Sequence, residues 1–185
     1  MRESATEMND LESSVVRFCA EAGADPLLVQ GAGGNVSWKE GGTLWVKASG
    51  TWLSDAATQQ IFVPVDLTVL KAAIDSGNYA VAPTPISSSD LRPSIETLLH
   101  ALMPHTVVVH LHAVDILARM VRRNCEDELR ALIGTRLPWE IVDYFRPGAE
   151  LALAVRMALQ RKPDATVIFL KNHGVVFGGS DVEEI

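Results

Sequence analysis

The pattern of apolar and polar residues switches between helical and strand spacing along the chain. Helical spacing predicts helices over residues 11–22, 67–76, 95–103, 114–124, 126–133 and 149–161. Apolar and β-branched runs predict strands over residues 36–39, 43–47, 61–65, 106–111 and 165–170, with 175–177 continuing the last one. Because helices and strands are intermixed without a strict βαβ repeat, we expect a single α/β domain over residues 1–185 with a mostly antiparallel sheet.

Several side chains mark the ends of these elements. Asp66 can cap the helix that follows it, and Ser94 can cap a helix that carries Glu96. Ser180 and Glu183 have the spacing of a capping box, but the sequence ends at Ile185. We therefore expect either that a last C-terminal helix is lacking or that the tail is frayed.

The strand over residues 106–111 carries the strongest chemical signal. His110 and His112 are two residues apart, and such residues point to the same face of a strand. Two imidazoles on an apolar face are costly to bury without a shared partner, although each can instead bond to the backbone or to a side chain. Since imidazole is a common ligand of catalytic divalent metals, the pair predicts a metal site.

Other polar residues can complete such a site. His173 follows a second apolar strand and precedes a glycine, which makes it the best candidate for a third ligand. His100 and His105 are expected to be surface or structural residues. Glu96 can act as a general base beside a metal, whereas alone it would be a first-turn carboxylate favoured by the helix dipole.

A glycine-rich stretch, Gly31-Ala32-Gly33-Gly34-Asn35, leads into a strand. It is not a dinucleotide fingerprint, because no helix opens on it, and it lacks the Gly-Lys-Ser/Thr of a P-loop. Its backbone N–H groups can turn towards an anion, and Ser37, Ser49, Gly50 and Ser94 can complete such a pocket. Ordinary turn glycines are the alternative interpretation.

The composition limits the classes of partner. The net charge of −7 argues against nucleic acid or an anionic membrane as the main partner. The chain has two cysteines at no metal-ligand spacing, which is typical of reduced thiols in a cytosolic protein. Since we find no signal pattern and no apolar run of membrane-spanning length, we expect a soluble, cytoplasmic protein.

Taken together, these stretches resemble the class II aldolase/adducin family over residues 10–179. The matching pieces are Gly33-Gly34-Asn35-Val36-Ser37, Ala48-Ser49-Gly50, Pro93-Ser94-Ile95-Glu96, His110-Leu111-His112 and Asn172-His173-Gly174. They look most like the aldolase-like half of bifunctional rhamnulose-phosphate aldolase/dehydrogenase proteins. The resemblance implies an α/β/α sandwich around a central antiparallel sheet, and a homotetramer with its site at a subunit interface.

The resemblance also implies a chemistry. It indicates a zinc-dependent lyase that cleaves a phosphorylated ketose, such as fuculose or rhamnulose phosphate, through a metal-stabilised enediolate. Carried over by residue, the metal ligands would be His110, His112 and His173, and Glu96 would be the acid/base. Substrate phosphate would be bound by a set of small and polar residues, namely Gly34, Asn35, Ser49, Gly50 and Ser94.

Some features leave other functions open. Ile95 stands where fuculose-phosphate aldolases have a second serine, and the family's proton-donating tyrosine has only Tyr144 as a candidate here. The same site can serve a sugar-phosphate epimerase, dehydratase or decarboxylase, and adducin is a non-catalytic interaction domain of this fold. An amidohydrolase with an HxH pair would need a longer barrel than this chain can form.

Overall fold

The computed structural model describes residues 3–185, and one seven-stranded sheet lies at its centre. The strands are β1 (Asn35–Glu40), β2 (Thr43–Lys47), β3 (Phe62–Asp66), β4 (Val107–Leu111), β5 (Trp139–Val142), β6 (Val167–Leu170) and β7 (Gly174–Gly179). They are ordered β3-β2-β1-β4-β7-β6-β5, and every neighbouring pair is antiparallel except β5 and β6. The mostly antiparallel sheet is therefore confirmed.

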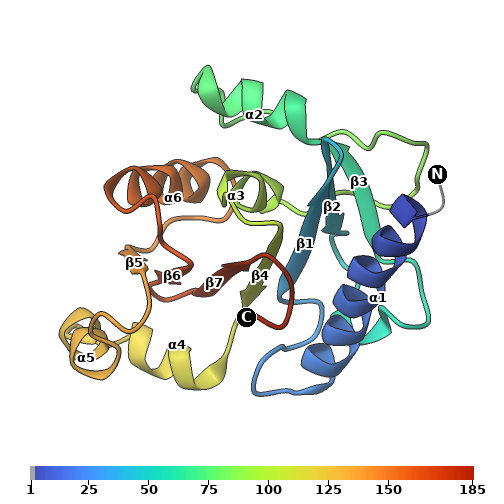
Figure 1. Cartoon of the computed structure of the whole chain (residues 1–185). Coiled ribbons are helices and arrows are strands. Elements are labelled where there is room, and N and C mark those ends of the chain that lie inside the picture. The colour runs from blue at the N-terminus through green and yellow to red at the C-terminus, as the bar shows by residue number, and fades with distance from the viewer. Residues whose placement is uncertain (1–2) are drawn as a thin grey trace.

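Helices cover both faces of the sheet. They are α1 (Glu3–Ala24), α2 (Leu67–Asp75), α3 (Thr97–Leu102), α4 (Val114–Met120), α5 (Cys125–Leu132) and α6 (Ala149–Arg161), with a short 3₁₀ turn, η1, at Leu53–Asp55. Figure 1 shows α2, α3 and α6 along one side of the sheet, and α4 and α5 along the other. Alternate strand residues pack against each layer: Val107 and Val109 of β4 join the core beneath α1, α4 and α5, whereas Val108 packs under α3 and α6. The α/β/α sandwich is confirmed.

Turn and cap residues act locally as the sequence predicts. The Asp66 carboxylate accepts the backbone N–H groups of Thr68 at 2.8 Å and Val69 at 3.1 Å, which caps α2. Gly41 and Gly42 adopt φ angles of +52° and +88°, so the β1–β2 hairpin turns where glycines allow it. The hairpin places β2 beside β1, and β1 in turn pairs with β4, the strand that carries His110.

Four expectations about single elements are wrong. The first helix begins at Glu3 rather than near residue 11, and β5 was not expected at all. Residues 175–177 belong to β7, a separate strand antiparallel to β6, and do not continue that strand. In the tail, the Asp181 carboxylate, instead of Ser180, accepts the N–H groups of residues 183 and 184.

The expected position of Glu96 on a helix is also wrong. Residue 96 is the N-cap of α3, which begins at Thr97. Ser94 does not cap that helix; its hydroxyl accepts the backbone N–H of Glu96 at 3.2 Å, within the turn that precedes α3. The Glu96 side chain is therefore carried by the turn that precedes α3.

The structure also bears on the membrane expectation. Among the helices of residues 3–185, none is both long enough and apolar enough to cross a bilayer. A cytoplasmic location stays a prediction.

Candidate metal centre and anion-binding loops

Three histidines from two parts of the chain meet at one end of the sheet. His110 lies on β4, His112 follows directly after that strand, and His173 lies in the turn between β6 and β7. One ring nitrogen of each histidine lies within 4.8 Å of the other two. The Nε2 atoms of His110 and His112 are only 3.1 Å apart. The structure thus brings together the three residues that the sequence singled out as metal ligands.

The β6–β7 turn places His173 because its neighbours permit a very close approach. Asn172 adopts φ +54°, which reverses the chain, and the His173 N–H donates to the Leu170 carbonyl at 3.2 Å. At Gly174, an added Cβ would lie 2.4 Å from the Leu111 carbonyl oxygen and 3.1 Å from atoms of both His110 and His112. The glycine after His173 is therefore a packing requirement of the histidine cluster.

Hydrogen bonding and burial keep these imidazoles in the form that binds metal. His110 is fully buried, and its Nδ1 is 3.0 Å from the Val175 carbonyl. This contact assigns the proton to Nδ1 and leaves the Nε2 lone pair facing the cluster. Burial lowers the pKa of His110 to about 3, with His112 adding to the effect. Burial followed by the nearby His110 lowers the pKa of His173 to about 4.

Glu96 completes the cluster from the α3 side. Its Oε1 is 3.3 Å from the His173 Nε2 and 3.5 Å from the His110 Nε2, and it has no hydrogen-bond partner among the described residues. The carboxylate forms no cap hydrogen bond with α3, which disfavours the alternative of a residue that only serves the helix end. Burial raises the pKa of Glu96, against the opposing effects of His173, His112 and Lys47.

The donor set fits a divalent metal. Three neutral imidazole nitrogens converge, and the buried Oε1 of Glu96 faces them without a partner of its own. Three protein ligands with room for a further one are the arrangement of catalytic zinc sites. A buried carboxylate oxygen without a partner is costly, and a cation at this point would remove that cost.

Three segments predicted to bind phosphate lie side by side next to this cluster. Asn35 pairs with His110 across β1 and β4, and its Nδ2 donates to the Ser94 hydroxyl at 2.5 Å. The Ser49 N–H donates to the Arg92 carbonyl at 2.8 Å, which joins the Ser49–Gly50 loop to the segment before Ser94. Ser49 and Gly50 are exposed, and Gly34 adopts φ +69° at the turn into β1. The five predicted residues are thus neighbours in space.

Lys47 was missed by the sequence analysis, although it connects these loops. The side chain is 3% exposed, and its Nζ donates to the carbonyls of Ala32, Ala48 and Thr51 at 3.2, 3.3 and 2.6 Å. Burial lowers its pKa to about 8. A lysine at the end of a hairpin strand looks like a surface residue, and no sequence signal indicates that it would bridge two loops.

Other candidates lie elsewhere. Ser37 is fully buried and bonds to His100, so it does not line the anion pocket. His105 packs against Gly178 near the opposite end of β7. Tyr144 is 55% exposed in the segment between β5 and α6, and its role as a proton donor stays a prediction.

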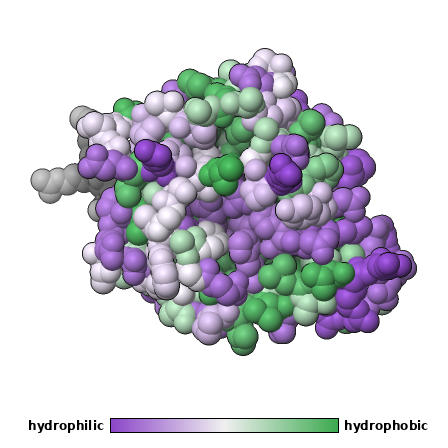
Figure 2. Space-filling view, turned by 180° about the vertical axis from the view of Figure 1, so that it is seen from behind, coloured by the Kyte–Doolittle hydropathy of each residue, from purple (hydrophilic) through white to green (hydrophobic). Residues whose placement is uncertain are grey.

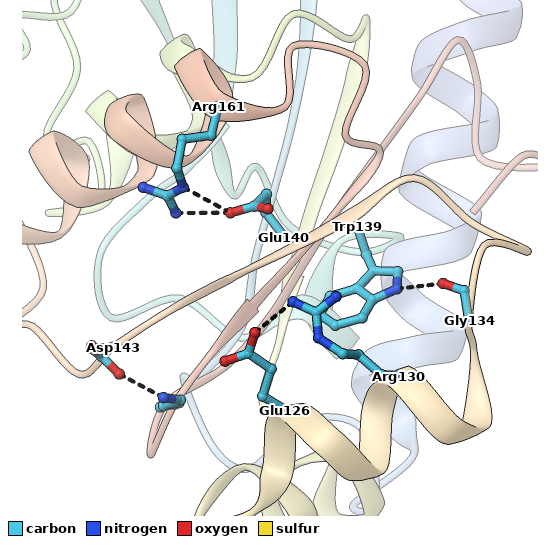
Figure 3. Close-up of polar contacts among 8 residues, drawn as sticks. Glu126, Arg130, Gly134, Trp139, Glu140, Asp143 and Arg161 are labelled. Atoms are coloured by element: carbon cyan, nitrogen blue, oxygen red, sulfur yellow. Dashed lines mark hydrogen bonds and ion pairs between the residues drawn. The ribbon is translucent and has the colours of Figure 1, made fainter.

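A large cavity of about 780 Å³ lies away from the histidine cluster, along the outer edge of β5. Figure 3 shows charged residues of its lining in pairs: Arg161 with Glu140, Arg130 with Glu126, and Asp143 with a lysine that is Lys171. The remaining charged lining residues, Lys162 and Asp164, also pair with each other. Since these cations and anions already satisfy one another, the cavity offers no unbalanced charge to a ligand. The histidine cluster therefore remains the candidate site.

Comparison with known proteins supports the family assignment. Residues 13–185 match the family described as Class II Aldolase and Adducin N-terminal domain. The chain is 31% identical over 160 residues to L-fuculose phosphate aldolase of Methanocaldococcus jannaschii, which covers 85% of this chain and 78% of that protein. It is 30% identical over 179 residues to the uncharacterized oxidoreductase YuxG of Bacillus subtilis. That match covers 87% of this chain but only 25% of YuxG, so the chain spans about a quarter of that relative's length.

A solved structure shares the fold. The N-terminal class II aldolase domain of a conserved protein from Thermoplasma acidophilum superimposes with a TM-score of 0.74 at 27% identity. The match covers 91% of this chain and 83% of that one.

Proposed function

This chain belongs to the class II aldolase and adducin family, and we propose that it is a zinc-dependent lyase that cleaves a phosphorylated ketose by retro-aldol reaction. One observation carries the proposal. Three neutral imidazoles and a buried carboxylate oxygen without a partner share one point, directly beside loops that present hydroxyl groups and backbone N–H groups.

The proposal gives each group a role. His110, His112 and His173 would hold the ion, which when bound supplies Lewis-acid stabilisation for negative charge on substrate oxygens. Ser49 and Ser94 would donate hydroxyl hydrogen bonds to the substrate phosphate. Gly34, Asn35 and Gly50 would shape and complete this anion pocket, since glycine allows the backbone N–H groups to approach closely.

Glu96 is proposed as the acid/base. In the cleavage, the hydroxyl group of the leaving fragment gives up its proton to solvent as its oxygen becomes the aldehyde carbonyl. The electron pair of the broken carbon–carbon bond stays on the fragment that resembles dihydroxyacetone phosphate, and that carbon must then gain a proton. Oε1 of Glu96 would deliver this proton, and in the reverse direction would remove it. Burial raises the pKa of this carboxyl group above its ordinary value, which makes it a better proton acceptor than an exposed carboxylate.

Proton exchange on dihydroxyacetone phosphate tests this role without requiring the aldehyde partner. The zinc-loaded protein is expected to exchange one carbon-bound proton with deuterated solvent, as measured by NMR. Glu96→Gln should keep the metal and slow exchange by about 10²–10⁴-fold, the usual contribution of a general acid/base. Glu150→Gln, an exposed carboxylate on α6, is the matched control and should leave exchange unchanged. Unchanged exchange in Glu96→Gln would refute the assignment.

The reaction and substrate can be separated by a product assay. Zinc-loaded protein is incubated with a panel of ketose phosphates, and released triose phosphate is measured with a coupled enzyme. Release from a deoxyketose or pentulose phosphate supports a lyase. Epimerised, dehydrated or decarboxylated products without triose phosphate would replace aldol cleavage by one of these reactions, with the same metal and acid/base groups.

We also propose that the protein is a homo-oligomer, a tetramer by analogy with the family. Figure 2, which views the molecule from behind, shows apolar residues gathered at the lower right, on the side where α4 and α5 lie. Val114 and Val121 of the α4 region are 41% and 60% exposed, and Val114 is two residues from His112. Light scattering during size-exclusion chromatography should give about four times the mass of one chain, and a monomer would contradict this part of the proposal.

A further inference from the structure

A buried hydrogen bond between Ser37 and His100 stands out because neither residue belongs to the metal cluster. The Ser37 hydroxyl is 2.7 Å from Nδ1 of His100, and both residues are 0% exposed. The His100 Nε2 has no hydrogen-bond partner within residues 10–185, whose side chains the structure describes. The bond to Ser37 is therefore the polar contact that fixes this imidazole.

The Ser37–His100 hydrogen bond lies on the same face of the sheet as the candidate site. Ser37 and Asn35 are two residues apart on β1, so both face the α3 layer, as do Val108 and His110 on the neighbouring β4. Asn35 bonds to Ser94, two residues before Glu96. Ser37 bonds to His100, four residues after Glu96. The two β1 side chains thus hold the segment on either side of Glu96.

The backbone transmits this restraint to Glu96. The His100 N–H donates to the Glu96 carbonyl at 3.2 Å, so fixing the imidazole also fixes the peptide group of residue 96. Glu96 lies outside α3 and forms no cap hydrogen bond, so α3 alone does not hold its side chain in place. Burial, followed by the nearby His110, lowers the pKa of His100 well below its ordinary value, and the imidazole stays neutral.

We propose that the Ser37–His100 hydrogen bond is a positioning device that holds Glu96 against His110 and His173. The inference rests on the proposed acid/base role of Glu96, and adds two residues that do not touch the substrate. Displacing a reacting group by about 1 Å can cost about a hundredfold in rate. Loss of the bond should therefore lower the rate of proton transfer while leaving the metal ligands intact.

The first test uses Ser37→Ala, which removes the hydroxyl and leaves α3 packed through Leu99 and Ala101. In metal-free protein, deuterium exchange at the His100 N–H, which reports the bond to Glu96, should speed up by about tenfold. In zinc-loaded protein, kcat for proton exchange on dihydroxyacetone phosphate should fall by about 10- to 100-fold, with KM and zinc content unchanged. Ser14→Ala removes a serine hydrogen bond in α1 and should alter none of these quantities.

Two substitutions of His100 separate positioning from packing. The amide of Asn lies near the position of Nδ1 and can still bond to Ser37, whereas the amide of Gln lies near that of Nε2 and cannot. His100→Asn should therefore retain more kcat than His100→Gln, although Asn leaves the larger cavity and should be the less stable variant. Rates that follow thermal stability across the variants, or normal amide exchange and kcat in Ser37→Ala, would overturn the inference. An inactive wild-type protein would refute the proposed function, and amide exchange would still decide the restraint.

Discussion

Replacing Gly174 by alanine tests how closely the β6–β7 turn must approach the histidine cluster. Gly174 has no positive φ angle, so alanine is compatible with its backbone conformation. The added Cβ would lie 2.4 Å from the Leu111 carbonyl oxygen, whereas such contacts essentially never fall below 3.0 Å. The turn must then move by at least about 0.6 Å, carrying His173 with it. Such overpacking costs about 1–3 kcal/mol in the free energy of unfolding.

The assay compares zinc affinity and stability in the same variant. Since groups that orient metal ligands typically contribute about 10- to 100-fold in affinity, we expect a loss of that size for Gly174→Ala in competition with a chelating dye. Gly179→Ala is the matched control, because its Cβ would also meet a backbone oxygen, that of Asp181 at 2.9 Å, at the far end of β7. The control should lose stability but keep zinc affinity. Equal zinc affinity in Gly174→Ala and wild type would refute the reasoning.

Three further predictions concern charge and specificity. The pKa values of His110 and His173 are lowered in the folded state, so metal-free protein should lose stability as the pH falls from about 6.5 towards 4. Buried His110 alone should contribute a loss of about 1.4 kcal/mol per pH unit. Urea unfolding midpoints measure this loss, and a midpoint that does not change with pH would contradict the prediction. Ile95 is 67% exposed beside Ser94, so Ile95→Ser should leave the melting temperature nearly unchanged. The new hydroxyl should lower KM for a phosphorylated ketose by about tenfold, which is the effect of one hydrogen bond to a charged group. An unchanged KM would mean that the phosphate binds elsewhere. Lys47→Met should raise KM at constant zinc content, because Nζ no longer joins the loops of Ala32 and Thr51, and loss of zinc in a folded variant would contradict this role.

The sequence predicts the fold well where local chemistry decides the structure. The Gly41-Gly42 turn and the Asp66 cap involve neighbouring residues, and both are found where expected. β5 has only four residues at the sheet edge, and its alternation is too short to distinguish it from a loop. Ser94 was misread because a serine two residues before Glu96 can form a turn as readily as a cap.

The same distinction between local and long-range contacts applies to the candidate site. The spacing of His110 and His112 could be predicted because a strand fixes it, and His173 followed from the adjacent glycine. The Ser37–His100 bond joins residues 63 apart in the sequence, and its existence depends on how α3 packs on β1. Such long-range polar contacts leave no periodic signal, so only the structure reveals what holds Glu96.

The most direct test of the central claim is the metal content of the purified protein. The claim is that His110, His112 and His173 hold one divalent ion beside Glu96. After zinc loading and extensive dialysis, elemental analysis should find about one zinc per folded chain, and His173→Ala, a change in the β6–β7 turn and not within a strand or helix, should remain folded and lose it. A well-folded wild-type protein that retains no zinc, or a His173→Ala variant that retains as much as wild type, would contradict the account.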